Sequence, residues 1–246
     1  MAFPYHPVMK DAKGLSTRSE EAYESVRQRI LRGQLSMGQG ISRRSIAAEL
    51  GMGFLPVSEA LMRLELEGLL ESSPRAGTRV RIPSRDDVQG HYIVREALET
   101  QAARQFSQVA KLNDRAELKR LAARVDALSN EPNRMQYLQL HERLHYRIAE
   151  CAECPALTHA IERSHSLASI WMCVSAGPAL EQLDQPHVDL IEGLCSINPE
   201  MAADAMRSHV QRSLNRTLIR LAPYFQLRQQ DGGKFVRKKK LPVRPL

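Results

Sequence analysis

Apolar residues recur at intervals of three and four positions in three segments near the N-terminus, which is the spacing of one helix face. The three apolar stripes are Tyr23, Val26 and Ile30; Ile46, Ala47 and Leu50; and Val57, Leu61 and Leu64. A glycine follows each stripe, at Gly33, Gly51 and Gly68, and glycine commonly ends a helix because it adopts the left-handed backbone there. Ser42 is a suitable N-cap for the second helix, and Pro56 suits the first turn of the third. The pattern therefore predicts three short helices.

The segments Leu69–Ser73 and Thr78–Ile82 predict two short strands around a tight turn with the sequence Pro-Arg-Ala-Gly. Three helices followed by a β-hairpin within one small domain are typical of a winged helix-turn-helix. The first part of the chain is therefore predicted to have this fold.

Every longer segment after Asp86 has helical periodicity, and no strand pattern of useful length follows. We expect helices near 86–109, 114–128, 133–150, 155–173, 178–196 and 199–222. Pro132, Pro155, Pro178 and Pro199 lie at or near the starts of four of them. The sequence thus predicts a mainly α protein, with the winged helix-turn-helix followed by an all-α bundle of six or seven helices.

These patterns divide the chain into five parts. We expect a disordered leader at 1–17, the winged-helix domain at 18–82, a linker at 83–85, the all-helical domain at 86–225 and a basic flexible tail at 226–246.

The net charge of +7 over 246 residues is compatible with nucleic-acid binding, but its distribution weakens that inference. From Gln226 onward the tail holds seven basic residues and one acidic residue, whereas residues 18–85 hold eleven basic and eight acidic residues. The tail suits either non-specific contact with phosphates or a solvated end. Charge alone therefore decides no function.

No apolar run is long enough to cross a membrane, and the first residues lack the apolar core of a secretory signal. We therefore expect a cytoplasmic protein with reduced thiols and no membrane partner. Cys151 and Cys154 form a C-x-x-C pair, which is compatible with a redox pair or half of a zinc site. Because no second pair is present, we interpret them as two small residues near a helix end.

Four of the eight histidines lie on helix faces that are otherwise apolar. His141 and His145 share one face of the predicted helix 133–150, and His187 and His209 lie on the apolar stripes of two further helices. A buried imidazole needs a partner, so the four are either hydrogen-bonded core residues or the shared ligands of one metal ion. Four imidazoles favour zinc, nickel or copper over manganese, calcium or magnesium.

The segment from His141 to His145 also matches the H-E-x-x-H pattern of zinc peptidases, in which Glu142 would activate a zinc-bound water. The pattern is short and arises by chance. His187 and His209 would also fill the protein shell of the ion and leave less room for water and a substrate. A zinc-dependent peptidase is the alternative hypothesis.

One register of residues spans about sixty positions of the N-terminal segment. It comprises Tyr23, Val26-Arg27, Ile30, Gly33, Leu35, Ile41 to Ala47, Leu50-Gly51, Pro56-Val57, Glu59 to Leu61, Arg63-Leu64, Glu67 to Leu69 and the wing glycine Gly77. This register resembles the GntR family of bacterial regulators, and the helical segment behind it resembles the FCD ligand-binding domain of the fatty-acid-regulator branch of that family. The resemblance implies a DNA-binding transcriptional regulator, not an enzyme, whose partner is a double-stranded DNA operator.

The predicted recognition helix departs from the family pattern. The family usually has Ser-Arg-Thr before its Pro-Val and an arginine just after it, whereas this chain has Gly53-Phe54-Leu55 and Ser58. Only Arg44 keeps its place among the DNA-contacting arginines. Phe54, Leu55 and Ser58 occupy these positions and are candidate DNA contacts. Phe54 and Leu55 would either contact a thymine methyl group or pack against the protein.

The predicted wing supplies four further candidate DNA contacts, namely Arg75, Gly77, Thr78 and Arg79. They suit a phosphate or minor-groove contact, and the alternative is that the charges are solvated on the hairpin.

The FCD resemblance implies a metal site. In the metal-binding domains of this kind the first ligand is usually aspartate and the next three are histidines; His145, His187 and His209 match, and His141 replaces the aspartate. We expect a divalent transition metal, zinc or nickel. Four neutral imidazoles would leave the charge of the ion uncompensated by protein, which favours an anionic effector.

Arg95 lies where the family commonly has an arginine close to the ligand pocket. It would pair with the carboxylate of a small organic-acid effector, and the alternative is a salt bridge with Glu99 four residues later. The resemblance further implies a homodimer that acts as a repressor. A winged helix that binds another protein instead of DNA is a third hypothesis.

Overall fold

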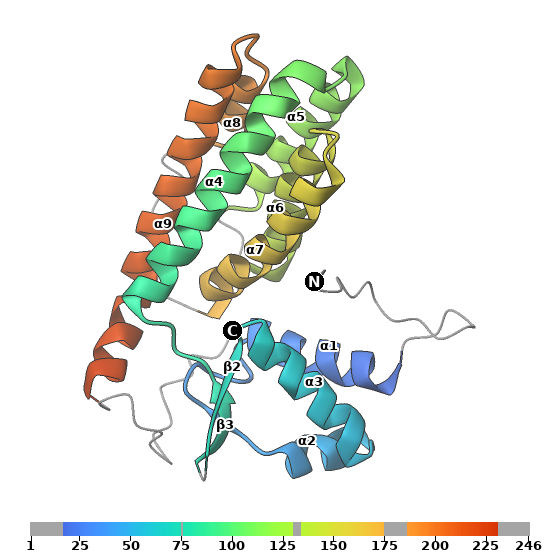
Figure 1. The fold of residues 1–246 in the computed structure, drawn as a ribbon, viewed down its shortest axis with the longest axis vertical. Helices are drawn as coiled ribbons and strands as arrows, with labels where there is room; N and C mark the ends of the chain where they lie inside the picture. The colour runs from blue at the N-terminus through green and yellow to red at the C-terminus, as the bar shows by residue number, and fades with distance from the viewer. Residues whose placement is uncertain (1–16, 75, 130–133, 175–185, 231–246) are drawn as a thin grey trace. The chain divides into compact units, whose positions relative to one another are not determined.

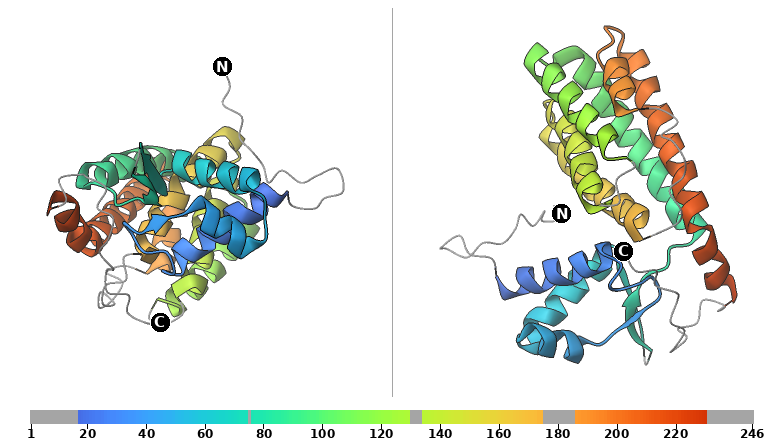
Figure 2. Two further views of the ribbon diagram at one scale, coloured as in Figure 1. Left: turned by 90° about the horizontal axis from the view of Figure 1, so that it is seen from below. Right: turned by 180° about the vertical axis from the view of Figure 1, so that it is seen from behind.

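The computed structural model describes residues 17–74, 76–129, 134–174 and 186–230 (Figure 1). The chain divides into two compact units, one formed by residues 1–82 with 228–246 and one by residues 83–227. Figure 2 shows the ribbon from two further directions.

The first unit contains the three predicted helices, α1 (Arg18–Leu31), α2 (Arg43–Leu50) and α3 (Phe54–Leu66). The side chains of Thr17 and Ser42 cap α1 and α2 by accepting the backbone N–H of the residue three positions later. Gly51 ends α2 in the left-handed conformation, with φ of 62°, which a residue with a side chain rarely adopts. This turn joins α2 to α3 as the glycine pattern predicts.

Helix α1 packs against α3 through apolar and polar contacts. Val26 and Leu61 are among the fully buried residues of the two helices. The Tyr23 hydroxyl donates to the Glu67 carboxylate at 2.7 Å, and the Arg63 guanidinium lies over the Tyr23 ring at 3.8 Å. Burial raises the pKa of Tyr23, and the nearby Glu67 carboxylate raises it further, so the hydroxyl keeps the proton that it donates.

A small antiparallel sheet completes the unit. Its strands are β1 (Gly40–Ile41), β2 (Leu70–Ser73) and β3 (Gly77–Val80), in the order β1-β3-β2. The hairpin β2–β3 is the predicted wing, with Leu70 opposite Val80. The strand β1, in which Gly40 lies opposite Arg79, was not predicted because two residues are too short to show alternation.

The second unit is the predicted all-α bundle (Figure 1). Its helices in the described part of the chain are α4 (Arg85–Val109), α5 (Leu112–Ala127), α6 (Arg134–Glu150), α7 (Pro155–Val174), α8 (His187–Leu194) and α9 (Pro199–Gln230). Pro155 and Pro199 begin α7 and α9 as predicted. No helix within these described ranges is long and apolar enough to span a membrane.

Two of the predicted helix boundaries were wrong. Helix α8 begins at His187, after Pro186 as its N-cap, and residues 178–185 of the predicted helix 178–196 lie outside the described residues. Helix α9 runs past the predicted end at 222 and through Pro223 to Gln230. Residues 226–230, predicted as the start of a flexible tail, are therefore helical.

Helices α4 and α9 lie side by side along the bundle (Figure 1). A bidentate pair joins Arg104 to Glu200 at 2.8 and 2.9 Å. The buried Tyr92 hydroxyl lies 3.1 Å from Ser213 Oγ and 2.8 Å from Thr217 Oγ1. These contacts fix the inward face of α9 relative to α4.

Candidate metal centre and nucleic-acid interface

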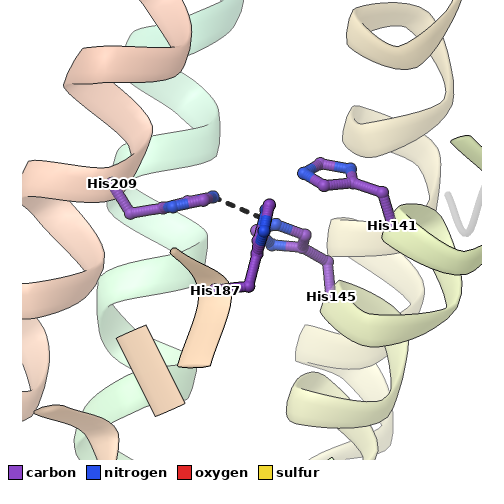
Figure 3. Close-up of side chains that lie close together, drawn as sticks. All are labelled: His141, His145, His187 and His209. Atoms are coloured by element: carbon purple, nitrogen blue, oxygen red, sulfur yellow. Dashed lines mark hydrogen bonds between the residues drawn. The ribbon is translucent and has the colours of Figure 1, made fainter. Parts of the chain in front are cut away.

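Four imidazoles converge inside the bundle (Figure 3). His141 and His145 project from one face of α6, His187 is the first residue of α8, and His209 lies on the inward face of α9. All four histidines are buried, and none is more than 4% exposed. One ring nitrogen from each lies within 4.8 Å of the others. The structure therefore brings together all four histidines that the helical spacing singled out.

A carboxylate from α5 positions His187. Asp126 accepts the backbone N–H groups of His187 and Val188 at 2.9 and 3.1 Å, so it caps the N-terminus of α8. The same carboxylate lies 2.6 Å from His187 Nδ1. Burial acts to raise the pKa of Asp126, but the hydrogen bonds from His187 and Val188 outweigh it and hold this pKa below its ordinary value. Asp126 is thus an ionised acceptor.

A second carboxylate, Glu99 of α4, lies 2.8 Å from His145 Nδ1. An ionised carboxylate accepts but does not donate, so the Nδ1 atoms of His145 and His187 hold the hydrogens and their Nε2 atoms keep the lone pairs. His187 Nε2 is buried and has no hydrogen-bond partner among the described residues. His145 Nε2 lies 3.2 Å from His209 Nε2.

Burial favours the neutral form of His145 and His209. It lowers the pKa of His145 below the ordinary 6.5, and Glu99 offsets only part of that effect. The pKa of His209 is lowered well below 6.5, first by burial and then by the charges of His145 and His187. Converging imidazole nitrogens, two of them on rings that a carboxylate holds in place, are ligands that suit a zinc, nickel or copper ion. The donor set fits such an ion.

The sequence did not indicate that Glu99 and Asp126 contact the histidines. These two carboxylates lie directly behind two of the imidazoles, His145 and His187. The i, i+4 spacing of Arg95 and Glu99 pointed to one of them. The contact of Asp126 with His187 joins residues 61 positions apart, so no local pattern revealed it.

Arg95 is only 1% exposed, and its Nε donates to Glu99 Oε1 at 2.8 Å. The salt bridge considered as the alternative to effector binding is therefore present, and Glu99 links Arg95 to His145. A second arginine, Arg216, was not singled out, although it lies on α9 two helical turns after His209. Its Nε is buried without a hydrogen-bond partner in the described ranges, and its charge contributes to lowering the pKa of His209.

The candidate DNA contacts on the helix-turn-helix lie in different environments. Arg44 is exposed on α2. Phe54 and Leu55 begin α3 and are 56% and 69% exposed, so they do not pack into the protein. Ser58 Oγ is buried and makes no hydrogen bond to any described residue.

Two of the wing candidates are engaged within the hairpin. Thr78 is 8% exposed, and its hydroxyl lies 2.9 Å from Ser72 Oγ. Arg79 Nε donates to Glu71 at 2.6 Å across the two strands. Gly77 begins β3 with φ of 91° and is exposed, and Arg75 lies outside the described residues.

Two family models match the chain. The model described as "Bacterial regulatory proteins, gntR family" matches residues 18–80, and the one described as "FCD domain" matches residues 91–212. A helix-turn-helix of this kind followed by an FCD domain defines a class of DNA-binding transcriptional regulators. The chain belongs to the GntR family, in the branch that has an FCD domain.

Several relatives support this assignment. The "Probable D-xylose utilization operon transcriptional repressor" of Paenarthrobacter nicotinovorans is 26% identical over 82% of this chain and 89% of its own length. The HTH-type transcriptional repressor RspR of Escherichia coli K12 is 22% identical over 78% of this chain and 86% of its own.

Two solved structures share the fold. One is a GntR transcriptional regulator from Rhodococcus sp. RHA1, with a TM-score of 0.66 and 20% identity, covering 82% of this chain and 97% of that one. The other is E. coli McbR/YncC, with a TM-score of 0.65 and 19% identity, covering 87% and 99%.

The family is one of DNA-binding regulators and not of enzymes, as the resemblance implied. The peptidase hypothesis gains no support from these relatives. The H-E-x-x-H match instead lies on a helix whose two histidines meet two more from α8 and α9, and together these form a cluster that could hold a metal ion.

Proposed function

We propose that a small organic acid, bound beside a zinc or nickel ion at His141, His145, His187 and His209, changes the affinity of this regulator for its double-stranded DNA operator. The observation that supports the proposal is the convergence of four buried imidazole nitrogens within 4.8 Å of one another. When bound, the ion would supply a Lewis-acidic centre that attracts a carboxylate oxygen.

The charges around the imidazoles favour an anion. Glu99 and Asp126 bring two negative charges, and Arg95 and Arg216 bring two positive charges. The charge of a divalent ion would therefore stay uncompensated by the protein. Because Glu99 holds the Nε of Arg95, Arg216 is a second candidate for the effector carboxylate, and direct effector binding by Arg95 stays a prediction.

The effector must bind two states of the bundle with different affinities in order to change DNA binding. Two winged helices of a homodimer would contact two half-sites of one operator, which multiplies affinity. We propose that the ligand changes the distance between the two winged-helix domains of the dimer. We propose repression as the outcome, since two relatives are named repressors.

The test is the DNA affinity of the metal-loaded protein, measured by gel shift on the region upstream of its own gene. A panel of small carboxylates should include one that changes the affinity about fivefold or more, and His187→Ala should abolish the response. Unchanged DNA affinity under a carboxylate that calorimetry shows to be bound at saturation would contradict the proposal, and so would tighter binding of neutral sugars.

The role of Arg216 is tested by Arg216→Gln, which should weaken carboxylate binding and leave the metal content unchanged. Arg207→Gln is the matched control, because Arg207 lies on the same helix but pairs with Glu96 and Asp204 and is 37% exposed. Equal carboxylate affinity in the two variants would remove Arg216 from the effector site.

A further inference from the structure

Two large apolar side chains are exposed side by side in the sequence at the start of α3. Phe54 is 56% and Leu55 is 69% exposed, and they occupy the first two positions of the helix after Gly53. Exposed apolar area is costly in water, so an adjacent pair at the tip of a recognition helix indicates a contact that is made on binding.

The same end of α3 offers few groups that hydrogen-bond to bases. Among its first six residues, only Ser58 and Glu59 have polar side chains, and Ser58 Oγ is buried. Glu59 has no donor, so neither residue reproduces the arginine contact to guanine O6 and N7. The direct contact left to Phe54 and Leu55 is an apolar one, and thymine displays an apolar group, its C5-methyl, in the major groove.

The surroundings of this apolar pair suit a nucleic acid better than an apolar protein surface. Arg43 and Arg44 begin α2, and neither α2 nor α3 has an acidic residue in its first turn. Gly53 caps α3 without a side-chain hydrogen bond, so the positive end of the helix dipole is not offset by a capping side chain. A positive helix end at the apolar pair, together with two arginines on the preceding helix, matches thymine methyl groups flanked by phosphates.

We propose that Phe54 and Leu55 select thymine in the operator by direct contact with its C5-methyl group in the major groove. The inference rests on DNA binding through α3, which the proposed function also requires. It adds which base is recognised and through which group.

Uracil in place of thymine removes the methyl group alone, which gives a direct test. Duplexes selected from a random library by the full-length, metal-loaded protein are made again with uracil at single thymine positions. Wild-type protein should bind each contacted position about fourfold more weakly after this change, the effect expected for one buried methyl group. Replacing cytosine by 5-methylcytosine at such a position should restore part of the affinity that a thymine-to-cytosine change removes.

Phe54→Ala and Leu55→Ala should each lose the thymine-over-uracil preference at one position. Leu66→Ala is the matched control, because Leu66 is 84% exposed at the other end of the same helix and should leave the preference unchanged. Thermal unfolding checks that all three exposed-site variants stay folded.

A wild-type protein that binds thymine and uracil duplexes equally would overturn the inference, as would a preference that survives in both variants. In either case the DNA-binding function would stand. Recovery of no preferred sequence from the library would instead contradict the proposed operator recognition itself. These outcomes separate the two claims.

Discussion

At the scale of single residues, Asp126 has two structural tasks. It caps α8 through two backbone N–H groups, and it binds Nδ1 of His187, which turns the lone pair of Nε2 toward the other three imidazoles. A carboxylate behind a ligand imidazole also makes that imidazole a more basic donor. The negative charge of Asp126 therefore matters separately from its hydrogen-bonding shape.

Asp126→Asn removes the charge and keeps an oxygen that can cap the helix. We expect zinc affinity to fall about 10- to 100-fold, because His187, one of the four proposed metal ligands, loses its charged partner, with only a small loss of stability. Competition with a chelating dye measures the affinity. Asp189→Asn, an exposed position on the same helix, is the control and should bind zinc like the wild type. Equal affinity of Asp126→Asn and wild type would show that the carboxylate is only a cap.

Cys151 is a buried free thiol, and burial raises its pKa to about 11. The thiolate is the reactive form, so alkylation of Cys151 by iodoacetamide at pH 8 should be much slower in the folded protein than in urea. Mass spectrometry of the labelled peptide measures the rate. Rapid labelling of the folded protein, or a disulfide with Cys154 after mild oxidation, would restore the redox interpretation of the C-x-x-C pair.

Residue-scale prediction from sequence succeeded where the evidence lay within one helix. The four histidines were found because each occupies an apolar stripe. Asp126 was not found because its partner is distant in the sequence. Thr78 in the wing was predicted to contact DNA, but it is buried. Side chains alternate between the two faces of a strand, and the sequence of the wing does not show which face of the three-stranded sheet packs against the protein.

At the scale of helices, the close approach of α8 to α9 depends on Gly193. A Cβ atom built at Gly193 would lie 2.6 Å from the Cβ of Ala205, which is closer than real Cβ atoms come. Because His187 and His209 lie on these two helices, their separation affects the candidate metal centre.

Gly193→Ala should therefore force the two helices apart. We expect a loss of about 1–3 kcal/mol in the free energy of unfolding, typical of overpacking, together with weaker zinc binding. Urea unfolding measures the first effect. Adding Ala205→Gly removes the clashing atom and should recover part of the zinc affinity, whereas a zinc affinity that stays low in the double variant would contradict the steric explanation.

Element-scale prediction was accurate for helices with strong periodicity and poor for short or interrupted ones. Helix α2 has the predicted bounds, and β1 was missed because two residues show no pattern. Helix α9 was predicted to end at 222, but it continues through Pro223 to Gln230. Tertiary packing, which a local pattern does not contain, decides such cases.

At the scale of the whole molecule, buried neutral histidines connect stability to pH. The folded-state pKa values of His145 and His209 are lowered below 6.5, so the unfolded chain binds protons that the folded chain does not. Their contribution to stability is present above pH 6.5 and is lost as the pH falls below that value.

Metal-free protein should therefore unfold at lower urea concentration at pH 5.5 than at pH 7.5, and zinc should increase the difference because protons compete for its ligands. His209→Gln should show a smaller dependence on pH than wild type. Equal or greater stability of the metal-free protein at pH 5.5 would contradict the assignment of these histidines as buried and neutral.

The order of the two domains was predictable from sequence, because a dense register of residues marks the winged helix and repeated helical periodicity marks the bundle. The identity of the proposed effector was not predictable from sequence beyond the expectation that it is an organic acid. The recognition that we propose would depend on the relative positions of Arg95, Arg216 and the imidazoles, which lie on α4, α6, α8 and α9.

Elemental analysis of the full-length protein, purified without a polyhistidine tag, shows whether the four histidines hold a transition-metal ion. We predict about one zinc or nickel ion per chain in the wild type and far less in the variant His187→Ala, because a four-ligand site binds one ion. Wild-type protein that stays free of transition metal after incubation with zinc, or a variant with the same metal content as the wild type, would show that these histidines are not metal ligands.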